Sequence, residues 1–265
     1  MKAVYLPDAR AFVRYAEVPG DDPPLLWLHG WQCSSTGELL GAAVAPALRG
    51  RRSLLIDFLG HGYSDKPHDF AYSLEAHAAT IVALIDGLGI RECGLFGHSM
   101  GGGVAIHVAA ARPSVVSLLI LAESWIDPDG EERFEGQAEA DFVERGFAEL
   151  TAGQSAEAAA APGGIRAAHL EMTRLIEPRA LYREAVSMRK GTDPPTREVL
   201  QRLAMPRWYL IGGLSDPEDL EADMAAIGVG WRVVPEAGHP MGLQNPAGLA
   251  QAVAEVTAFA APHLP

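Results

Sequence analysis

The stretch Glu92-Cys93-Gly94-Leu95-Phe96-Gly97-His98-Ser99-Met100-Gly101-Gly102-Gly103 decides the fold more than any other part of the chain. Its first half is short and mostly apolar and predicts a buried strand over 92–96, whereas helical spacing begins at Met100 and continues to 112. The residues between them have the pattern Gly-x-Ser-x-Gly, which at a strand-to-helix junction lifts a serine hydroxyl above the end of a sheet. Gly97 and Gly101 leave room for the strained backbone that such a turn requires.

Outward from this turn, short apolar runs alternate with longer helical patterns, which predicts a parallel sheet covered by helices on both faces. The N-terminus differs, because the runs 2–6 and 12–18 flank a four-residue turn and predict an antiparallel hairpin at the sheet edge. The other predicted strands are 25–29, 53–57, 115–122, 208–211 and 231–234. The other predicted helices are 36–48, 74–88 with Ser73 as N-cap, 217–227 and 246–259.

The alternation stops between residues 126 and 205, a segment rich in Ala, Glu and Arg with helical spacing, as at 141–150 and 165–175. We therefore predict a single sheet domain, formed by 1–125 and 206–265, with a helical lid inserted at 126–205.

Charge and composition exclude several classes of protein. The chain of 265 residues has 21 Lys and Arg against 34 Asp and Glu, a net charge of −13, which disfavours nucleic acid and anionic membrane surfaces as partners. Neither a membrane span nor a secretory signal is indicated, so a cytoplasmic monomer or homodimer is expected. Cys33 and Cys93 are isolated and predict reduced, buried thiols, and neither a metal-binding motif nor a cofactor is expected.

A serine hydroxyl needs a neighbouring imidazole to accept its proton before it can act as a nucleophile. His239 is the predicted base, because Ala237-Gly238-His239-Pro240 follows the strand 231–234 and falls on the same rim of the sheet as Ser99. His98 precedes the serine and is expected to point away from it and to pack. The remaining histidines are expected to be solvated or structural, and they are His29, His61, His68, His77, His107, His169 and His263.

An oxyanion hole is predicted from two backbone N–H groups, those of Trp31 and Met100. His29-Gly30-Trp31 follows the strand 25–29, where the first donor is expected. We predict that His29 braces this loop by hydrogen bonds.

Taken together, the motifs resemble those of the α/β-hydrolase superfamily. They are the strand followed by His29-Gly30, the segment Asp57-Phe58-Leu59-Gly60-His61-Gly62, the serine turn and the late Gly238-His239. The resemblance covers nearly the whole chain and implies an eight-stranded, mostly parallel sheet with a lid after the sixth strand. It also implies a Ser-His-acid triad in which Ser99 and His239 are the first two members. In such a protein Asp57 is a structural carboxylate of its loop.

Two carboxylates compete to be the acid that orients His239. Glu123 ends the apolar run 118–122 at the predicted catalytic edge, where an unpaired carboxylate is costly to bury, and we prefer it. Asp216 follows the strand 208–211 in Gly213-Leu214-Ser215-Asp216, where most members of the superfamily have their acid, but it is equally well placed as a helix N-cap.

The predicted function is hydrolysis of a carboxylic ester or lactone of a small, largely apolar, uncharged molecule through an acyl-enzyme. The alternatives are a cofactor-free perhydrolase or haloperoxidase-like enzyme, a carbon–carbon bond hydrolase and a non-catalytic ligand receptor of the same superfamily. Predicted pocket residues are Gly30, Trp31, Trp125, Met172, Leu175, Tyr182, Met188 and Met241.

Overall fold

The computed structural model describes residues 1–128, 134–215 and 218–260. It contains one eight-stranded sheet in the order β1-β2-β4-β3-β5-β6-β7-β8. The first two strands form the predicted antiparallel hairpin, β2 pairs antiparallel with β4, and β3 to β8 run parallel. The strands are β1 (Lys2–Leu6), β2 (Ala11–Val18), β3 (Asp21–Leu28), β4 (Arg51–Asp57), β5 (Cys93–His98), β6 (Val116–Ala122), β7 (Arg207–Gly212) and β8 (Gly230–Val234). The predicted eight-stranded, mostly parallel sheet is confirmed.

Side chains of the central strands alternate between two buried layers. In β3, Leu26 and Leu28 face the cluster that contains α3 (Leu74–Gly87) and α4 (Met100–Ala111), whereas Leu25 and Trp27 face the other. The second layer includes α12 (Pro246–Ala260) and the short α2 (Leu40–Ala43). Helices therefore cover both faces, which explains why the strands are almost uninterrupted apolar runs.

The helix predicted over 36–48 is wrong, because this segment consists of three short pieces. They are α1 (Ser35–Glu38), α2 and a 3₁₀ turn at Pro46–Leu48. Pro46 lacks the N–H that a continuing helix needs, and Ser34, not a later residue, caps α1 by accepting a hydrogen bond from Gly37 N–H. Ser73 caps α3 as predicted.

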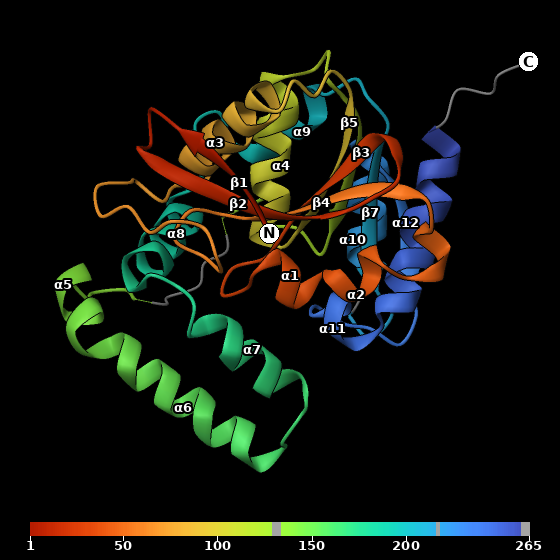
Figure 1. The fold of residues 1–265 in the computed structure, drawn as a ribbon. Helices are drawn as coiled ribbons and strands as arrows, with labels where there is room; N and C mark the ends of the chain where they lie inside the picture. The colour runs from red at the N-terminus through yellow and green to blue at the C-terminus, as the bar shows by residue number, and fades with distance from the viewer. Residues whose placement is uncertain (129–133, 216–217, 261–265) are drawn as a thin grey trace, which may run out of the picture.

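Between β6 and β7 the described residues form helices and connecting turns but no strand. Its elements are α5 (Glu139–Asp141), a π-helical turn (Phe142–Gly146), α6 (Phe147–Ala160), α7 (Ile165–Thr173), α8 (Pro178–Lys190) and α9 (Thr196–Arg202). In Figure 1, α6 and α7 project away from the sheet, whereas α9 lies against α4. The remaining helices are α10 (Glu218–Ala226) and α11 (Met241–Gln244). No helix among the described residues is both long and apolar enough to cross a lipid bilayer.

Glu184 of α8 joins this helical segment to the sheet domain through two buried histidines. Its Oε1 lies 2.8 Å from both His77 Nε2 and His61 Nε2, and its Oε2 lies 2.9 Å from His61 Nε2. His61 Nδ1 donates to the carbonyl of Cys33, so its Nε2 is free to accept. Burial raises the pKa of Glu184 to about 7 and lowers the pKa of His61 to about 4, which favours an uncharged arrangement. The protonated carboxyl then donates to His61 and accepts from His77.

We expect Glu184→Ala to lower the free energy of unfolding by about 2–5 kcal/mol, because it leaves polar atoms of two buried histidines without partners. Glu184→Gln should cost less than about 1 kcal/mol, since an amide can also donate to His61 and accept from His77. Urea denaturation of both variants measures the difference. Equal losses for Ala and Gln would contradict the uncharged network.

Candidate active site

Ser99 lies at the turn between β5 and α4 with φ 51° and ψ −122°, a conformation that non-glycine residues seldom adopt. Three backbone hydrogen bonds hold it there. Its N–H donates to Ala122 O at 3.0 Å, and its carbonyl accepts from the N–H groups of Gly102 at 3.0 Å and Trp125 at 2.9 Å. Such strain costs about 1–3 kcal/mol and persists only where the surroundings impose it.

Glycines surround this turn because other chain segments pass within contact distance. A Cβ atom on Gly97 would lie 2.5 Å from Gly101 O, and one on Gly101 would lie 2.5 Å from Leu28 O. A Cβ atom on Gly102 would overlap the side chain of Ser124. The glycine pattern is therefore a packing requirement of the serine turn.

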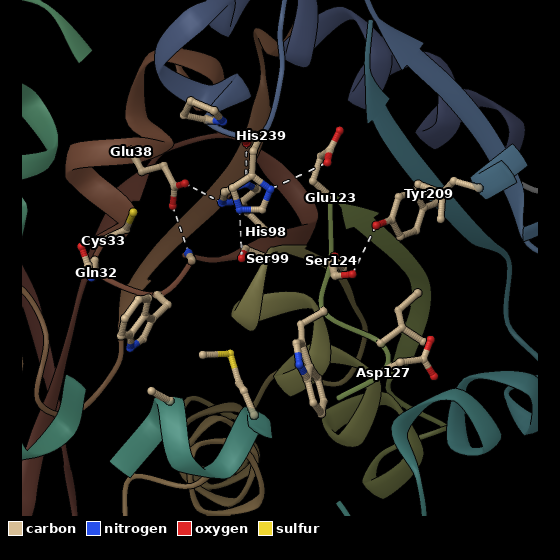
Figure 2. A pocket seen from close by; sticks show the side chains of 18 of the residues that line it. Gln32, Cys33, Glu38, His98, Ser99, Glu123, Ser124, Asp127, Tyr209 and His239 are labelled. Carbon is tan, nitrogen blue, oxygen red and sulfur yellow. Dashed lines mark hydrogen bonds and ion pairs between the residues drawn. The ribbon is translucent and has the colours of Figure 1, made fainter. Parts of the chain in front are cut away.

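His239 and Glu123 lie next to Ser99 in the order that proton transfer requires (Figure 2). His239 Nε2 is 3.1 Å from Ser99 Oγ, and His239 Nδ1 is 3.7 Å from a carboxylate oxygen of Glu123. The second distance is that of an ion pair and is longer than a direct hydrogen bond. The His239 side chain is 57% exposed and that of Glu123 is 14% exposed, so the cluster opens to solvent from the histidine side.

Glu123 sits directly after β6 in a left-handed conformation with φ 42°. Its other carboxylate oxygen accepts the Gly212 N–H at the end of β7 at 2.8 Å. Burial by itself would raise the pKa of Glu123, but the interactions with His239 and Gly212 outweigh it and hold the pKa below its usual value. Glu123 is therefore ionised and fixed beside His239. Asp216, the alternative acid, lies outside the described residues.

The loop after β3 passes beside the serine. A Cβ atom on Gly30 would lie 2.9 Å from His98 Nδ1 and 3.2 Å from Ser99 Cβ, so Gly30 lies tightly against the serine turn. Trp31, the first predicted oxyanion donor, lines the pocket, and Met100, the second, is the first residue of α4, where N–H groups have no acceptor inside the helix.

Two other predicted structural residues of these loops form backbone hydrogen bonds. His29 Nε2 accepts from Phe58 N–H at 3.1 Å, and its Nδ1 lies 2.8 Å from Gly30 O. Asp57 accepts the N–H groups of Ser35 and Tyr63 at 2.9 and 3.0 Å. Both side chains are fully buried.

Ser99, His239 and Glu123 open into a pocket of about 680 Å³. Of the predicted wall residues, Gly30, Trp31, Trp125 and Met188 line it. Tyr182 and Met241 do not line it. The Tyr182 hydroxyl donates to Gln137 O and its ring packs on Phe142, while Met241 is fully buried in the apolar layer next to α12. Met172 and Leu175 are likewise absent from its lining: Met172 is buried and Leu175 is 40% exposed.

Two charged side chains that line this pocket, Arg197 and Glu38, were not predicted from the sequence. Arg197 of α9 contacts Asp127 at 2.5 Å and Asp223 at 2.8 Å. Glu38 is fully buried and ion-paired with His98. Glu38 falls in the first turn of the helix predicted over 36–48, where acidic residues are ordinarily solvated, so nothing in its local sequence distinguishes it. His169 of α7 also lines the pocket, with Nε2 3.5 Å from Cys33 Sγ.

Cys33 and Cys93 are free and buried, as expected. Burial raises the pKa of both thiols, so neither is a reactive thiolate at neutral pH. Within the part of the chain that the structure describes, His, Cys, Asp and Glu side chains form no group of three or more suited to a metal ion.

We expect Gly102→Ala to destabilise the protein by about 1–3 kcal/mol, because the added methyl group must displace the Ser124 side chain from under the serine turn. Gly153→Ala is the matched control. Gly153 also lies within a helix, α6, but nothing stands within 4 Å of its added Cβ, so this variant should gain about 0.5–1 kcal/mol. Thermal denaturation of the two variants tests the steric argument, which fails if both shift in the same direction.

One protein family and several known proteins are similar to this chain. A family model described as alpha/beta hydrolase fold matches residues 23–193, more than half of the chain. The chain is similar to Haloalkane dehalogenase 2 of Mycobacterium bovis, with 32% identity over 121 residues, 45% of this chain and 41% of the relative. It is also similar to 2-hydroxymuconate semialdehyde hydrolase of Pseudomonas putida, with 34% identity over 105 residues, 40% of this chain and 37% of the relative. These alignments span less than half of each relative.

Among solved structures, a thermophilic esterase from Thermogutta terrifontis superposes with a TM-score of 0.82 at 22% identity, covering 98% of this chain and 99% of that one. At this identity the likeness concerns the fold.

Proposed function

Because the chain belongs to the alpha/beta hydrolase fold family, we propose that it is a serine hydrolase that cleaves a carboxylic ester or lactone through an acyl-enzyme. The observation that carries the proposal is the 3.1 Å contact between Ser99 Oγ and His239 Nε2 at a strained strand-to-helix turn. A serine hydroxyl within hydrogen-bond distance of an imidazole is the arrangement that nucleophilic attack on a carbonyl requires.

In the proposed mechanism His239 removes the Ser99 hydroxyl proton as Oγ attacks the substrate carbonyl carbon. The oxygen of the tetrahedral intermediate gains negative charge and accepts hydrogen bonds from Trp31 N–H and Met100 N–H. His239 then gives its proton to the leaving alcohol, and the C–O bond breaks. Water activated by His239 cleaves the acyl-enzyme by the same steps. Glu123, fixed by Gly212 N–H, orients the imidazole and stabilises its charged form.

A serine nucleophile favours reactions at a carbonyl carbon over reactions at a saturated carbon. Attack by serine on a saturated carbon would leave an ether, which water cannot readily cleave, whereas attack on a carbonyl leaves a hydrolysable ester. For this reason we do not extend the activity in the name of the dehalogenase relative to this chain. Carbon–carbon bond hydrolysis is kept as the second candidate because of the similarity to the semialdehyde hydrolase.

The pocket supports an uncharged substrate of moderate size. Its volume of about 680 Å³ falls in the range of small-molecule sites, and Trp31, Trp125 and Met188 supply apolar surface. Two carboxylates in its lining are already paired within the protein, Glu38 with His98 and Asp127 with Arg197. We therefore expect a panel of p-nitrophenyl esters and lactones of graded acyl size to contain substrates.

We expect the wild-type protein to hydrolyse p-nitrophenyl acetate or butyrate and to form a covalent adduct with a serine-directed phosphonate, whereas Ser99→Ala does neither. Loss of the nucleophile should lower kcat by about 10⁴-fold or more. Release of p-nitrophenol and intact-protein mass spectrometry measure the two effects. A wild-type protein that neither turns over nor forms the adduct would contradict the proposal and favour a non-catalytic ligand-binding role. Turnover that requires peroxide would favour the perhydrolase alternative.

Glu123→Gln should lower kcat by about 10³–10⁴-fold while the protein stays folded, because an amide cannot stabilise the charged imidazole. Asp216→Asn is the control and should stay close to wild type. Steady-state kinetics with circular dichroism on each variant distinguish the two acids. If instead Asp216→Asn collapses turnover and Glu123→Gln does not, the acid is Asp216, and wild-type turnover in both rejects the triad.

A further inference from the structure

Glu38 is a second buried carboxylate at the site, on the opposite side of the cluster from Glu123 (Figure 2). Its side chain is 2% exposed. One oxygen lies 2.5 Å from His98 Nδ1, and the other accepts the Gly30 N–H at 3.0 Å. Both carboxylate oxygens of Glu38 therefore have a partner. One contacts His98, the residue before Ser99, and the other contacts Gly30, the residue before Trp31.

The ring of His98 lies between two groups that accept hydrogen bonds. Its Nδ1 faces the Glu38 carboxylate, and its Nε2 is 2.8 Å from the backbone carbonyl of His239. A carbonyl only accepts and an ionised carboxylate only accepts, so both ring nitrogens carry a proton and His98 is a cation. Burial opposes this charge, but the contact with Glu38 outweighs it and raises the pKa of His98, while the pKa of Glu38 falls to about 2.

The ionisable groups that surround His98 come from five other elements. They are Glu38 of α1, His29 after β3, Glu123 after β6, His169 of α7 and His239 after β8.

The pair connects three segments that are far apart in sequence. They are the loop at Gly30, which carries the proposed oxyanion donor Trp31, the turn at Ser99, and the loop at His239. The His239 ring also lies over the His98 ring, with 4.8 Å between centroids. A shift of any one segment would therefore strain a buried hydrogen bond to the others.

We propose that Glu38 and His98 are positioning residues of the proposed active site, and that their ion pair, together with the hydrogen bonds to Gly30 N–H and to the His239 carbonyl, holds the oxyanion loop, the serine turn and the base in one arrangement. This inference rests on the proposed serine hydrolase function. The pair touches no reacting atom. Its effect is expected mainly on kcat, since oxyanion binding and proton transfer develop in the transition state, whereas the pocket walls Trp125 and Met188 are not held by this pair.

The chain provides its own matched control in Glu184. Both glutamates are almost completely buried and both contact histidine, but Glu184 contacts His61 and His77 and does not line the pocket. Glu38→Ala and Glu184→Ala should therefore both lower the melting temperature. Only Glu38→Ala should also lower kcat per folded molecule, by about 10–100-fold with KM changed less than about 3-fold, the scale expected of misplaced reacting groups. Glu184→Ala, whose helix α8 carries Ala185 and Met188 of the pocket wall, should act on KM and leave kcat close to wild type.

Glu38→Gln supplies the rescue. Its amide N–H can donate to Nδ1 of a neutral His98, its oxygen can accept from Gly30 N–H, and His98 Nε2–H still reaches the His239 carbonyl. We expect it to recover at least about half of the kcat, on a logarithmic scale, that Glu38→Ala loses. If Glu38→Ala does not fold, the double variant Glu38→Gln/His98→Ala replaces it. This variant leaves no unpaired buried charge but removes the hydrogen bond to the His239 carbonyl, so it should lose as much kcat as is expected for Glu38→Ala.

Equal kcat losses in Glu38→Ala and Glu184→Ala would overturn the proposal, as would unchanged kcat in Glu38→Ala. A Glu38→Gln variant with the same kcat loss as Glu38→Ala would also overturn it, because Gln can keep the contacts with His98 and Gly30 that the proposal holds responsible for kcat.

Nuclear magnetic resonance separates this inference from the proposed function. If the wild type neither turns over nor forms the phosphonate adduct, the proposed function fails, but the coupling of the segments is still measured. The amide signals of Trp31, Ser99 and His239 should shift together in Glu38→Ala and not in Glu184→Ala, and the His98 ring should keep its second proton to a higher pH than an ordinary histidine does. A His98 ring that loses this proton at the pH of an ordinary histidine, or shifts confined to Gly30, would overturn the inference whatever the activity.

Discussion

The backbone of Ser99 is held in a conformation that a serine does not adopt by itself, and the packing around it is what makes this possible. Its N–H is fixed by the end of β6 and its carbonyl by Trp125, so the neighbouring strand keeps the turn in place. Three glycines leave room for the close approach of the start of α4, the end of β3 and the Ser124 side chain. The direction of the hydroxyl, and hence its distance from His239, depends on this local packing.

Three of the glutamates described above contact histidines, and these contacts differ in burial. Glu184 with His61 and His77 is fully enclosed, and loss of hydration favours its uncharged form. Glu38 with His98 is almost as buried, but the contacts with His98 and with Gly30 N–H lower the pKa of Glu38 to about 2, which favours an ion pair. Glu123 with His239 is open on the histidine side. Similar residue types therefore form an uncharged buried network, a buried ion pair and a contact that is accessible to solvent.

Much of this architecture follows from local sequence. The strands are predicted because apolar runs bounded by turns form buried parallel sheets, and the meeting of Ser99 with His239 follows from their positions at the carboxyl ends of β5 and β8. Glu123 was preferred because a carboxylate ending an apolar run needs a partner, and it lies in ion-pair range of His239.

What the sequence did not reveal are contacts between distant segments. Glu38 and His98 are separated by sixty positions and meet only when α1 lies near the end of β5, so no local pattern marks them. The break of the helix predicted over 36–48 has a local cause in Pro46, which cannot supply the N–H that a continuing helix needs. Tyr182 and Met241 were expected in the pocket from residue type alone, which does not tell which side of a helix faces a cavity.

Glu184 connects α8 to the sheet domain, and the same helix forms part of the pocket wall. Ala185 and Met188, which follow Glu184 on the same helix, line the pocket, so this wall is tied directly to the interior of the sheet domain. His169 of α7 also lines the pocket, and α7 belongs to the helix pair that projects outward in Figure 1. Substitutions on α8 and changes in the α6–α7 pair would therefore reshape two separate parts of the pocket wall, one joined to the sheet domain through Glu184 and one carried by helices that project from it.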